Sequence, residues 1–245
     1  MTVAVAVAAL LAGVLIGLTG IGGVLVAPAL TEFAAVPVDR AIAASLLGFL
    51  IAGIVAAVAH LPRSGLPPVA LGILCAAAAI GAAAGATSLE LLPAVAVRLF
   101  IAVLALASGL HALLSPRASS EGELPSRPTL AALGLAVGYG SAVSGTGGPV
   151  MLIPLLLALR TPARAAVALG IAAQLPIVVT ATAINAMASR IDFQLGGMLA
   201  VLLALGTLGG SAAYRHLSGR ATTLSVAVML VATGVWYGFV TVRGT

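Results

Sequence analysis

Two glycine-rich turns with hydroxyl side chains beside them are the part of this chain best suited to chemistry. The first reads Thr19-Gly20-Ile21-Gly22-Gly23, and the second reads Ser144-Gly145-Thr146-Gly147-Gly148, 125 residues later. Successive backbone N–H groups in such a turn can converge on an anion, and a helix that starts there adds the positive end of its dipole. Glycine permits positive φ angles and close approach of a ligand. The sequence therefore predicts a site for a small oxyanion that is built twice, with Thr19, Ser144 and Thr146 as further donors.

The two turns belong to a longer internal repeat. Eight glycines recur at the offset of 125 residues: Gly13, Gly20, Gly22, Gly23, Gly72, Gly81, Gly85 and Gly109 correspond to Gly138, Gly145, Gly147, Gly148, Gly197, Gly206, Gly210 and Gly234. Self-similarity at a fixed period is typical of a structural repeat. Small residues also permit close helix packing in membranes, and we expect this packing role for the five glycines outside the turns and their partners.

The composition places these turns in a membrane. Hydrophobic residues make up 62% of the 245 residues and charged residues only 7%, whereas soluble domains carry about 25% charged residues. The eleven basic residues are all arginine and stand singly near the ends of apolar segments, where orientation signals and headgroup contacts belong. We therefore expect a lipid bilayer as the environment and no nucleic-acid partner. Cys75 alone cannot form an internal disulfide or a thiolate cluster, and no metal or cofactor is expected.

Eight apolar segments position the turns. The sequence predicts an all-α polytopic membrane protein with two homologous repeats of four segments, residues 1–114 and 129–245, joined by a polar linker at 115–128. The first segment of each repeat is too long for one upright helix, and glycines divide it near its middle, which favours a re-entrant hairpin. These broken segments are 3–36 and 129–158. Full transmembrane helices are expected at 41–60, 68–87, 94–114, 165–187, 194–213 and 222–242.

The path of the broken segments decides how the repeats are related. Four crossings per half would give parallel repeats, whereas three crossings and a hairpin give inverted ones. With eight crossings the arginines divide five to six between the two sides, and with two hairpins they divide seven to four. The second division favours inverted repeats and, by the positive-inside rule, places the linker in the cytoplasm.

Four polar residues outside the turns are further candidates. Gln174 lies inside a predicted span, where its amide must find a partner within the protein, and it could donate to a substrate or bridge two helices. Ser45 presents the same choice. His60 and Asn185 are partners at the offset of 125, near segment ends. They could serve proton uptake or gating, or they could be interfacial residues.

The chain resembles the sulfite exporter TauE/SafE family, also called the 4-toluene sulfonate uptake permease family. The resemblance rests on Gly-x-Gly-Gly followed by apolar residues and a proline, Pro28 or Pro154, once per half. The stretch Val38 to Leu46 also resembles the family's A-x-G-T-S-L segment through Ala43, Ser45 and Leu46. The spacing to the proline differs by one residue between the halves, so unequal half-sites are expected. The resemblance implies movement of small sulfur oxyanions or organosulfonates across the bacterial inner membrane, and it favours Ser45 as a site residue.

These observations predict a multi-pass inner-membrane transporter, not an enzyme, that holds a small sulfur-containing anion between the two turns and works by alternating access. The expected substrate-binding residues are Thr19, Gly20, Gly22, Gly23, Ser45, Ser144, Gly145, Thr146, Gly147, Gly148 and Gln174. A passive anion channel is an alternative, because none of the acidic residues lies clearly inside the membrane. A membrane-embedded enzyme is disfavoured, since the sequence shows no clustered acid, base or metal set.

Overall fold

Helix boundaries in the two halves of the chain correspond at the offset of 125 residues. The computed structural model describes residues 2–114, 122–213 and 219–243, except the side chains of residues 59, 60, 63, 219–223, 225 and 226. The first half contains α1 (Val3–Thr19), α2 (Val26–Ala34), α3 (Val38–His60), α4 (Pro68–Ser88) and α5 (Ala94–Leu114). The second half contains α6 (Arg127–Ser144), α7 (Pro149–Ala158), α8 (Ala163–Met187), α9 (Phe193–Ala213) and α10 (Gly219–Arg243). The helices α3, α4 and α5 begin 125 residues before α8, α9 and α10.

Local sequence explains where the central helices begin and end. Pro37 and Pro162 precede α3 and α8 in extended conformations, with ψ of 142° and 135°. The helices α1 and α6 end at Gly20 and Gly145, whose φ angles of 77° and 68° are left-handed. A left-handed residue after the last helical turn is a common helix terminator, and glycine adopts it without a steric cost.

Among the described residues, five helices are long and apolar enough to cross a membrane: residues 38–58, 68–91, 94–114, 163–187 and 193–213. They coincide with five of the six predicted spans to within four residues at each end. The sixth predicted span, 222–242, falls in α10, several of whose side chains lie outside the described part. The all-helical prediction is confirmed for the described residues.

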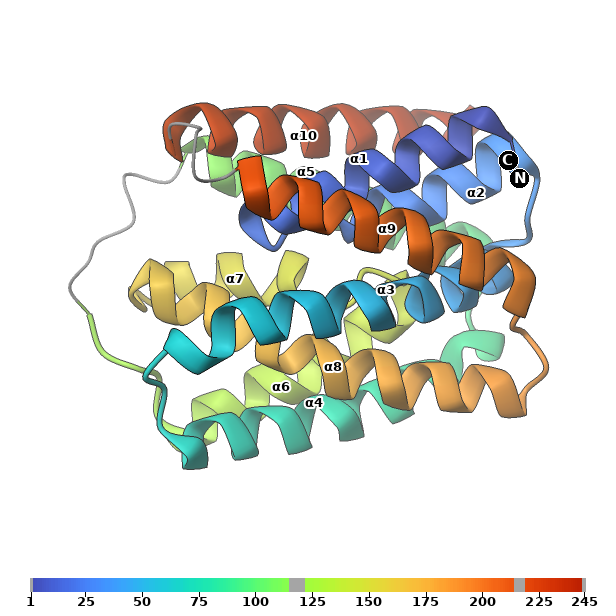
Figure 1. Ribbon diagram of the computed structural model, residues 1–245. Coiled ribbons are helices and arrows are strands. Elements are labelled where there is room, and N and C mark those ends of the chain that lie inside the picture. The colour runs from blue at the N-terminus through green and yellow to red at the C-terminus, as the bar shows by residue number, and fades with distance from the viewer. Residues whose placement is uncertain (1, 115–121, 214–218, 244–245) are drawn as a thin grey trace.

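The two broken segments form hairpins that enter from opposite ends. In Figure 1, α1 and α2 start and finish at the end that holds both chain termini, whereas α6 and α7 start and finish at the end of the linker. The first turn folds back onto its own helix, since a Cβ on Gly22 would lie 2.5 Å from the Ala12 carbonyl oxygen and 2.9 Å from Leu15 Cβ.

Glycines bring the helices of the two halves into backbone contact. A Cβ on Gly13 of α1 would lie 2.5 Å from the Leu203 carbonyl oxygen of α9, and a Cβ on Gly81 of α4 would overlap the Leu135 carbonyl of α6. The expected packing role fits these glycines. It is wrong for the pair Gly72 and Gly197, which are exposed and have no atom within 4 Å of the Cβ position.

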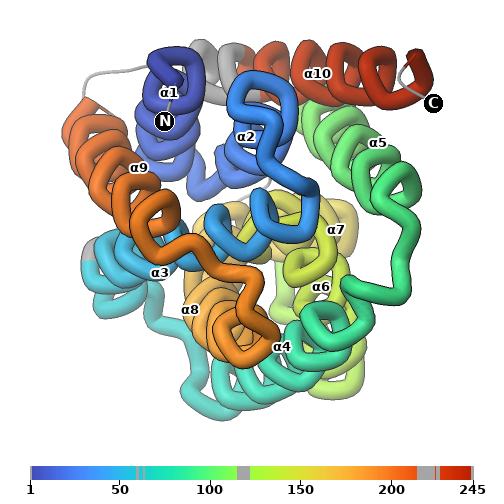
Figure 2. The backbone as a smooth tube through the Cα atoms, turned by 90° about the vertical axis from the view of Figure 1, so that its right-hand side faces the viewer, coloured from blue at the N-terminus to red at the C-terminus, as the bar shows by residue number. Residues whose placement is uncertain are grey.

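The helices α3 and α8 separate these packed pairs. In Figure 2, α1 and α9 lie above α3 and α8, α4 and α6 lie below or beside α8, and α5 lies beside α10; α3 runs out to the left edge of the bundle. The glycine turns therefore end in the interior of the bundle, next to α3 and α8.

Candidate functional site

The two glycine turns meet in the centre of the bundle. Gly23 packs so closely on the second turn that a Cβ there would overlap the carbonyl oxygen of Thr146. The same Cβ would lie 3.1 Å from Cζ of Phe49, and a Cβ on Gly147 would lie 3.5 Å from Cδ2 of that ring. One aromatic side chain from α3 therefore touches both turns. All five residues of the second turn are buried, as are Gly20, Gly22 and Gly23 of the first.

The glycines of each turn divide into two roles. The N–H groups of Gly20 and Gly145 donate to the Ile16 and Ser141 carbonyls at 2.8 and 2.9 Å, so these two glycines end their helices. Their amides are therefore already satisfied. This helix-ending role was missed at the sequence level, because a left-handed cap and an anion cradle both require glycine.

Six other backbone N–H groups at the turns have no hydrogen-bond partner among the described residues. They belong to Gly22, Gly23, Val24, Gly147, Gly148 and Val150, all of which are buried. Buried amides of native proteins are almost always paired with protein, water or a ligand. Each set lies at the start of a short helix, where the dipole favours negative charge. Six unpaired donors therefore lie on two turns that meet at Gly23 and Thr146.

The hydroxyl groups beside the turns are already engaged. Ser144 Oγ donates to the Gly140 carbonyl at 2.7 Å, and Thr146 Oγ1 lies 3.0 Å from it. Because each hydroxyl has a single proton, Thr146 is the donor in that second contact. Thr19 Oγ1 lies 3.0 Å from the Leu15 carbonyl, and Ser45 Oγ donates to the Ala41 carbonyl at 2.7 Å. In this conformation the free donors are backbone amides, not the predicted hydroxyls.

Gln174 lies inside α8, within a span as the sequence predicts, and the structure places it next to the second turn. Its Cγ would lie 3.8 Å from a Cβ on Gly147, and its side chain is 3% exposed. Nε2 donates to the carbonyl of Phe49 at 3.4 Å. Phe49 precedes Gln174 by 125 residues, so this hydrogen bond joins two corresponding positions. That correspondence was the one sequence signal that could have found Phe49.

The two turns differ in backbone geometry as well as in proline spacing. In the first turn a 3₁₀ segment, Gly23–Leu25, separates the glycines from α2, whereas in the second Pro149 starts α7 at once. Gly147 and Gly148 have φ of 81° and 116°, whereas Gly22 is extended at −176°. Proline also removes one N–H from the second set.

No charged side chain of the described residues lies in the middle of a helix. Each stands in a loop, or within the first five or last three residues of its helix. Glu32 and Arg98, for example, pair with each other at 3.2 Å near the ends of α2 and α5. The turns therefore offer an anion dipoles and hydrogen bonds without a fixed positive charge.

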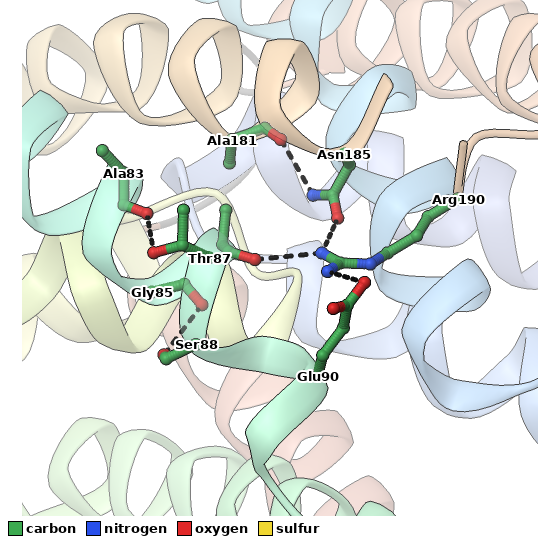
Figure 3. A network of polar contacts seen from close by, with 9 residues as sticks. Ala83, Gly85, Thr87, Ser88, Glu90, Ala181, Asn185 and Arg190 are labelled. Carbon is green, nitrogen blue, oxygen red and sulfur yellow. Dashed lines mark hydrogen bonds and ion pairs between the residues drawn. The ribbon is translucent and has the colours of Figure 1, made fainter. Parts of the chain in front are cut away.

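Asn185 belongs to a polar network at the end of α8, apart from the turns (Figure 3). Arg190 Nη1 donates to Asn185 Oδ1 and to the Ala86 carbonyl, both at 2.9 Å, and Nη2 pairs with Glu90 at 2.5 Å. Arg190 is only 7% exposed, so it packs inside the protein and differs from the general expectation of headgroup contacts for arginines at segment ends. The chain after α8 turns back through Ser189, with φ of 54°, and tucks the guanidinium against the end of α4. The side chain of His60 lies outside the described residues.

We expect Arg190→Met to lower the stability of the protein by about 1–3 kcal/mol, because Asn185 Oδ1 would be left buried without a donor. Arg164→Met is the matched control, since Arg164 is exposed at the start of α8. Thermal unfolding of the purified variants in detergent measures the difference. Equal melting temperatures for the two variants would show that the network does not stabilise the fold.

One comparison with known proteins gives a match. The family model described as Sulfite exporter TauE/SafE matches residues 5–237, which include every helix that borders the turns. No curated protein and no solved structure matches the chain. Among the described residues, no group of three or more His, Cys, Asp or Glu side chains could hold a metal ion.

Proposed function

Because this chain belongs to the sulfite exporter TauE/SafE family, a family of membrane transporters, we propose that it carries a small sulfur-containing anion across the bacterial inner membrane. Sulfite, thiosulfate and small organosulfonates are the expected substrates. The six buried, unpaired N–H groups at the facing turns are the observation that carries the proposal. An oxyanion presents several acceptor oxygens, and charge-assisted hydrogen bonds to it are about twice as strong as neutral ones.

We further propose that the two halves are inverted repeats that alternate around this site. Helix boundaries correspond at the offset of 125, so that α1 corresponds to α6 and α4 corresponds to α9. The packed pair of α1 with α9 therefore has its counterpart in the packed pair of α6 with α4. The hairpins enter from opposite ends of the bundle (Figure 1). In transporters built this way, one repeat or bundle rocks against the other around a fixed central site. Burial of both turns fits a closed state of such a cycle better than an open channel.

The arginines support an orientation with the linker in the cytoplasm. In the predicted topology with two hairpins, seven arginines fall on the side of the linker and four on the side of the termini. Two of those four, Arg98 and Arg190, form ion pairs within the protein with Glu32 and Glu90. The division of seven arginines to four is the asymmetry expected when the side of the linker is cytoplasmic.

A stability screen of the purified protein tests the substrate class. We expect sulfite, thiosulfate, sulfate or an organosulfonate to raise the melting temperature, and small carboxylates to have little effect. A ligand at 100 times its dissociation constant adds about 2.7 kcal/mol to the stability of the native state. Stabilisation by carboxylates alone, or by no anion, would contradict the proposed substrate class.

Transport against a concentration gradient separates the proposed mechanism from the passive alternative. Proteoliposomes would be given an imposed pH difference, and uptake of the stabilising anion would be followed with and without that difference. Accumulation above the external concentration supports alternating access with coupling. Equilibration without accumulation, for every imposed ion gradient, would favour a facilitator.

A further inference from the structure

We propose that the Phe49 ring is the plug of the anion site, which means that it fills the space between the two turns when no anion is bound. We also propose that the side chain of Gln174 contacts the anion after the ring has moved away. The inference rests on the proposed function of the turns and adds two residues with opposite roles. Neither role follows from the glycine motifs, because both side chains come from the central helices α3 and α8.

The position of the ring supports the plug. Phe49 is 1% exposed, and its two edges face different turns, with Cζ near Gly23 and Cδ2 near Gly147. Apart from the Thr146 carbonyl, the nearest atoms to those two glycine positions include carbons of this ring. Ring carbons accept no conventional hydrogen bond, and the unpaired amides of both turns have no other partner among the described residues. Burial of an unsatisfied amide costs free energy, and an oxyanion in place of the ring would recover it.

The contact made by Gln174 is easily given up. Its Nε2 donates to the Phe49 carbonyl at 3.4 Å, which is longer than the usual 2.9–3.0 Å for this type of hydrogen bond. That carbonyl lies inside α3, where carbonyls already accept a hydrogen bond from the amide four residues on. The side-chain amide can therefore leave without stranding its acceptor. Because Gln174 borders Gly147, its NH₂ group can turn to an anion held by the second turn.

The plug also predicts a limit on substrate size. If the ring must leave the space between the turns before an anion enters, the substrate can be no larger than the space that the ring leaves free. Methanesulfonate and benzenesulfonate carry the same sulfonate group and differ only in the apolar part. We expect the wild-type protein to prefer methanesulfonate, and Phe49→Ala to accept benzenesulfonate in the space that the missing ring leaves.

Two measurements on purified protein test the plug, and one of them needs no ligand. In a Cys75→Ala background, Thr146→Cys introduces a thiol beside the first turn at a position that is 3% exposed. We expect Phe49→Ala to raise the rate at which the thiol introduced by Thr146→Cys reacts with a hydrophilic methanethiosulfonate by about tenfold or more. We also expect it to lower the ratio of the affinity for methanesulfonate to that for benzenesulfonate by about tenfold. Phe100→Ala is the matched control, because Phe100 packs against Gly140 of α6 and not against the turns.

The outcomes distinguish the plug from the proposed function. One outcome is that anions stabilise the wild-type protein, but Phe49→Ala changes neither the reactivity of the introduced thiol nor the ratio of the two sulfonate affinities. The plug is then overturned, and the transport proposal stands. An equal rise in reactivity for Phe100→Ala also overturns it, since loss of any interior ring would then suffice. If the thiol becomes reactive only in Phe49→Ala while no anion binds any variant, the occluding role stands and the anion function fails. Gln174→Leu should weaken anion binding without raising the reactivity of the introduced thiol. Anion affinity equal to that of the wild type would show that Gln174 does not contact the anion.

Discussion

Gly23→Ala is expected to abolish transport without unfolding the protein. Gly23 has an ordinary backbone conformation, so alanine is tolerated there by the dihedral angles. The added methyl group would overlap the Thr146 carbonyl oxygen and approach Phe49 Cζ to 3.1 Å, and the two turns would have to move apart. Each hydrogen bond to a charged group is worth about 1.5–3 kcal/mol, so the loss of one weakens anion binding about 10- to 150-fold.

Two other alanine variants serve as controls for Gly23→Ala. Gly72→Ala makes the same chemical change in α4 where nothing lies within 4 Å, and it should transport like the wild type. Gly20→Ala introduces strain of about 1–2 kcal/mol at a φ of 77°, but its methyl group would meet only Ile153 Cδ1 at 3.5 Å. We expect lower thermal stability and retained anion affinity for it. Uptake by Gly23→Ala at the rate of Gly72→Ala would show that contact between the turns is not needed.

The positions of the membrane helices were predictable from the sequence because hydrocarbon permits few alternatives. Backbone groups must pair within each span, so an apolar run of about 20 residues becomes a helix whatever its neighbours are. The spans that begin near Pro37, Pro67 and Pro162 were accordingly placed within three residues of their observed bounds. The hairpins were predictable for a related reason, since arms of 17 and 9 residues in α1 and α2 are too short for an ordinary full crossing.

The inside of the site was only partly predictable. The glycine pattern located both turns, but it did not separate Gly20 and Gly145, which end helices, from the glycines with unpaired amides. Phe49 was not identified, because one phenylalanine in an apolar span looks like any other. Its role depends on which residues of other helices it meets.

Arg190 shows the same limit for polar residues. Its position between two spans indicates an interfacial residue, and most such arginines do contact solvent or headgroups. Its burial results from a left-handed turn at Ser189 that brings it to the Ala86 carbonyl, 104 residues away in the chain. A contact of that range has no signature in the local pattern.

Gly210→Leu is expected to prevent folding, whereas the same change at the preceding residue should be tolerated. A Cβ on Gly210 would overlap the Val14 carbonyl of α1, which is backbone and cannot rotate away, whereas Gly209 is exposed with nothing within 4 Å. We expect no monodisperse protein from Gly210→Leu after detergent extraction, and a normal yield from Gly209→Leu.

The smaller change Gly210→Ala keeps this packing prediction measurable when the leucine variant yields no protein. Overpacking of an interior typically costs about 1–3 kcal/mol, so Gly210→Ala should melt at a lower temperature than Gly209→Ala, and equal melting temperatures would contradict the packing argument.

Gly85 corresponds to Gly210 at the offset of 125, and a Cβ on it would lie 2.5 Å from the Tyr139 carbonyl oxygen of α6. If the halves are true repeats, the interface of α4 with α6 repeats that of α1 with α9. Gly85→Ala should then destabilise the protein by a similar amount, and a tolerated Gly85→Ala beside a damaging Gly210→Ala would show that the two interfaces are not equivalent.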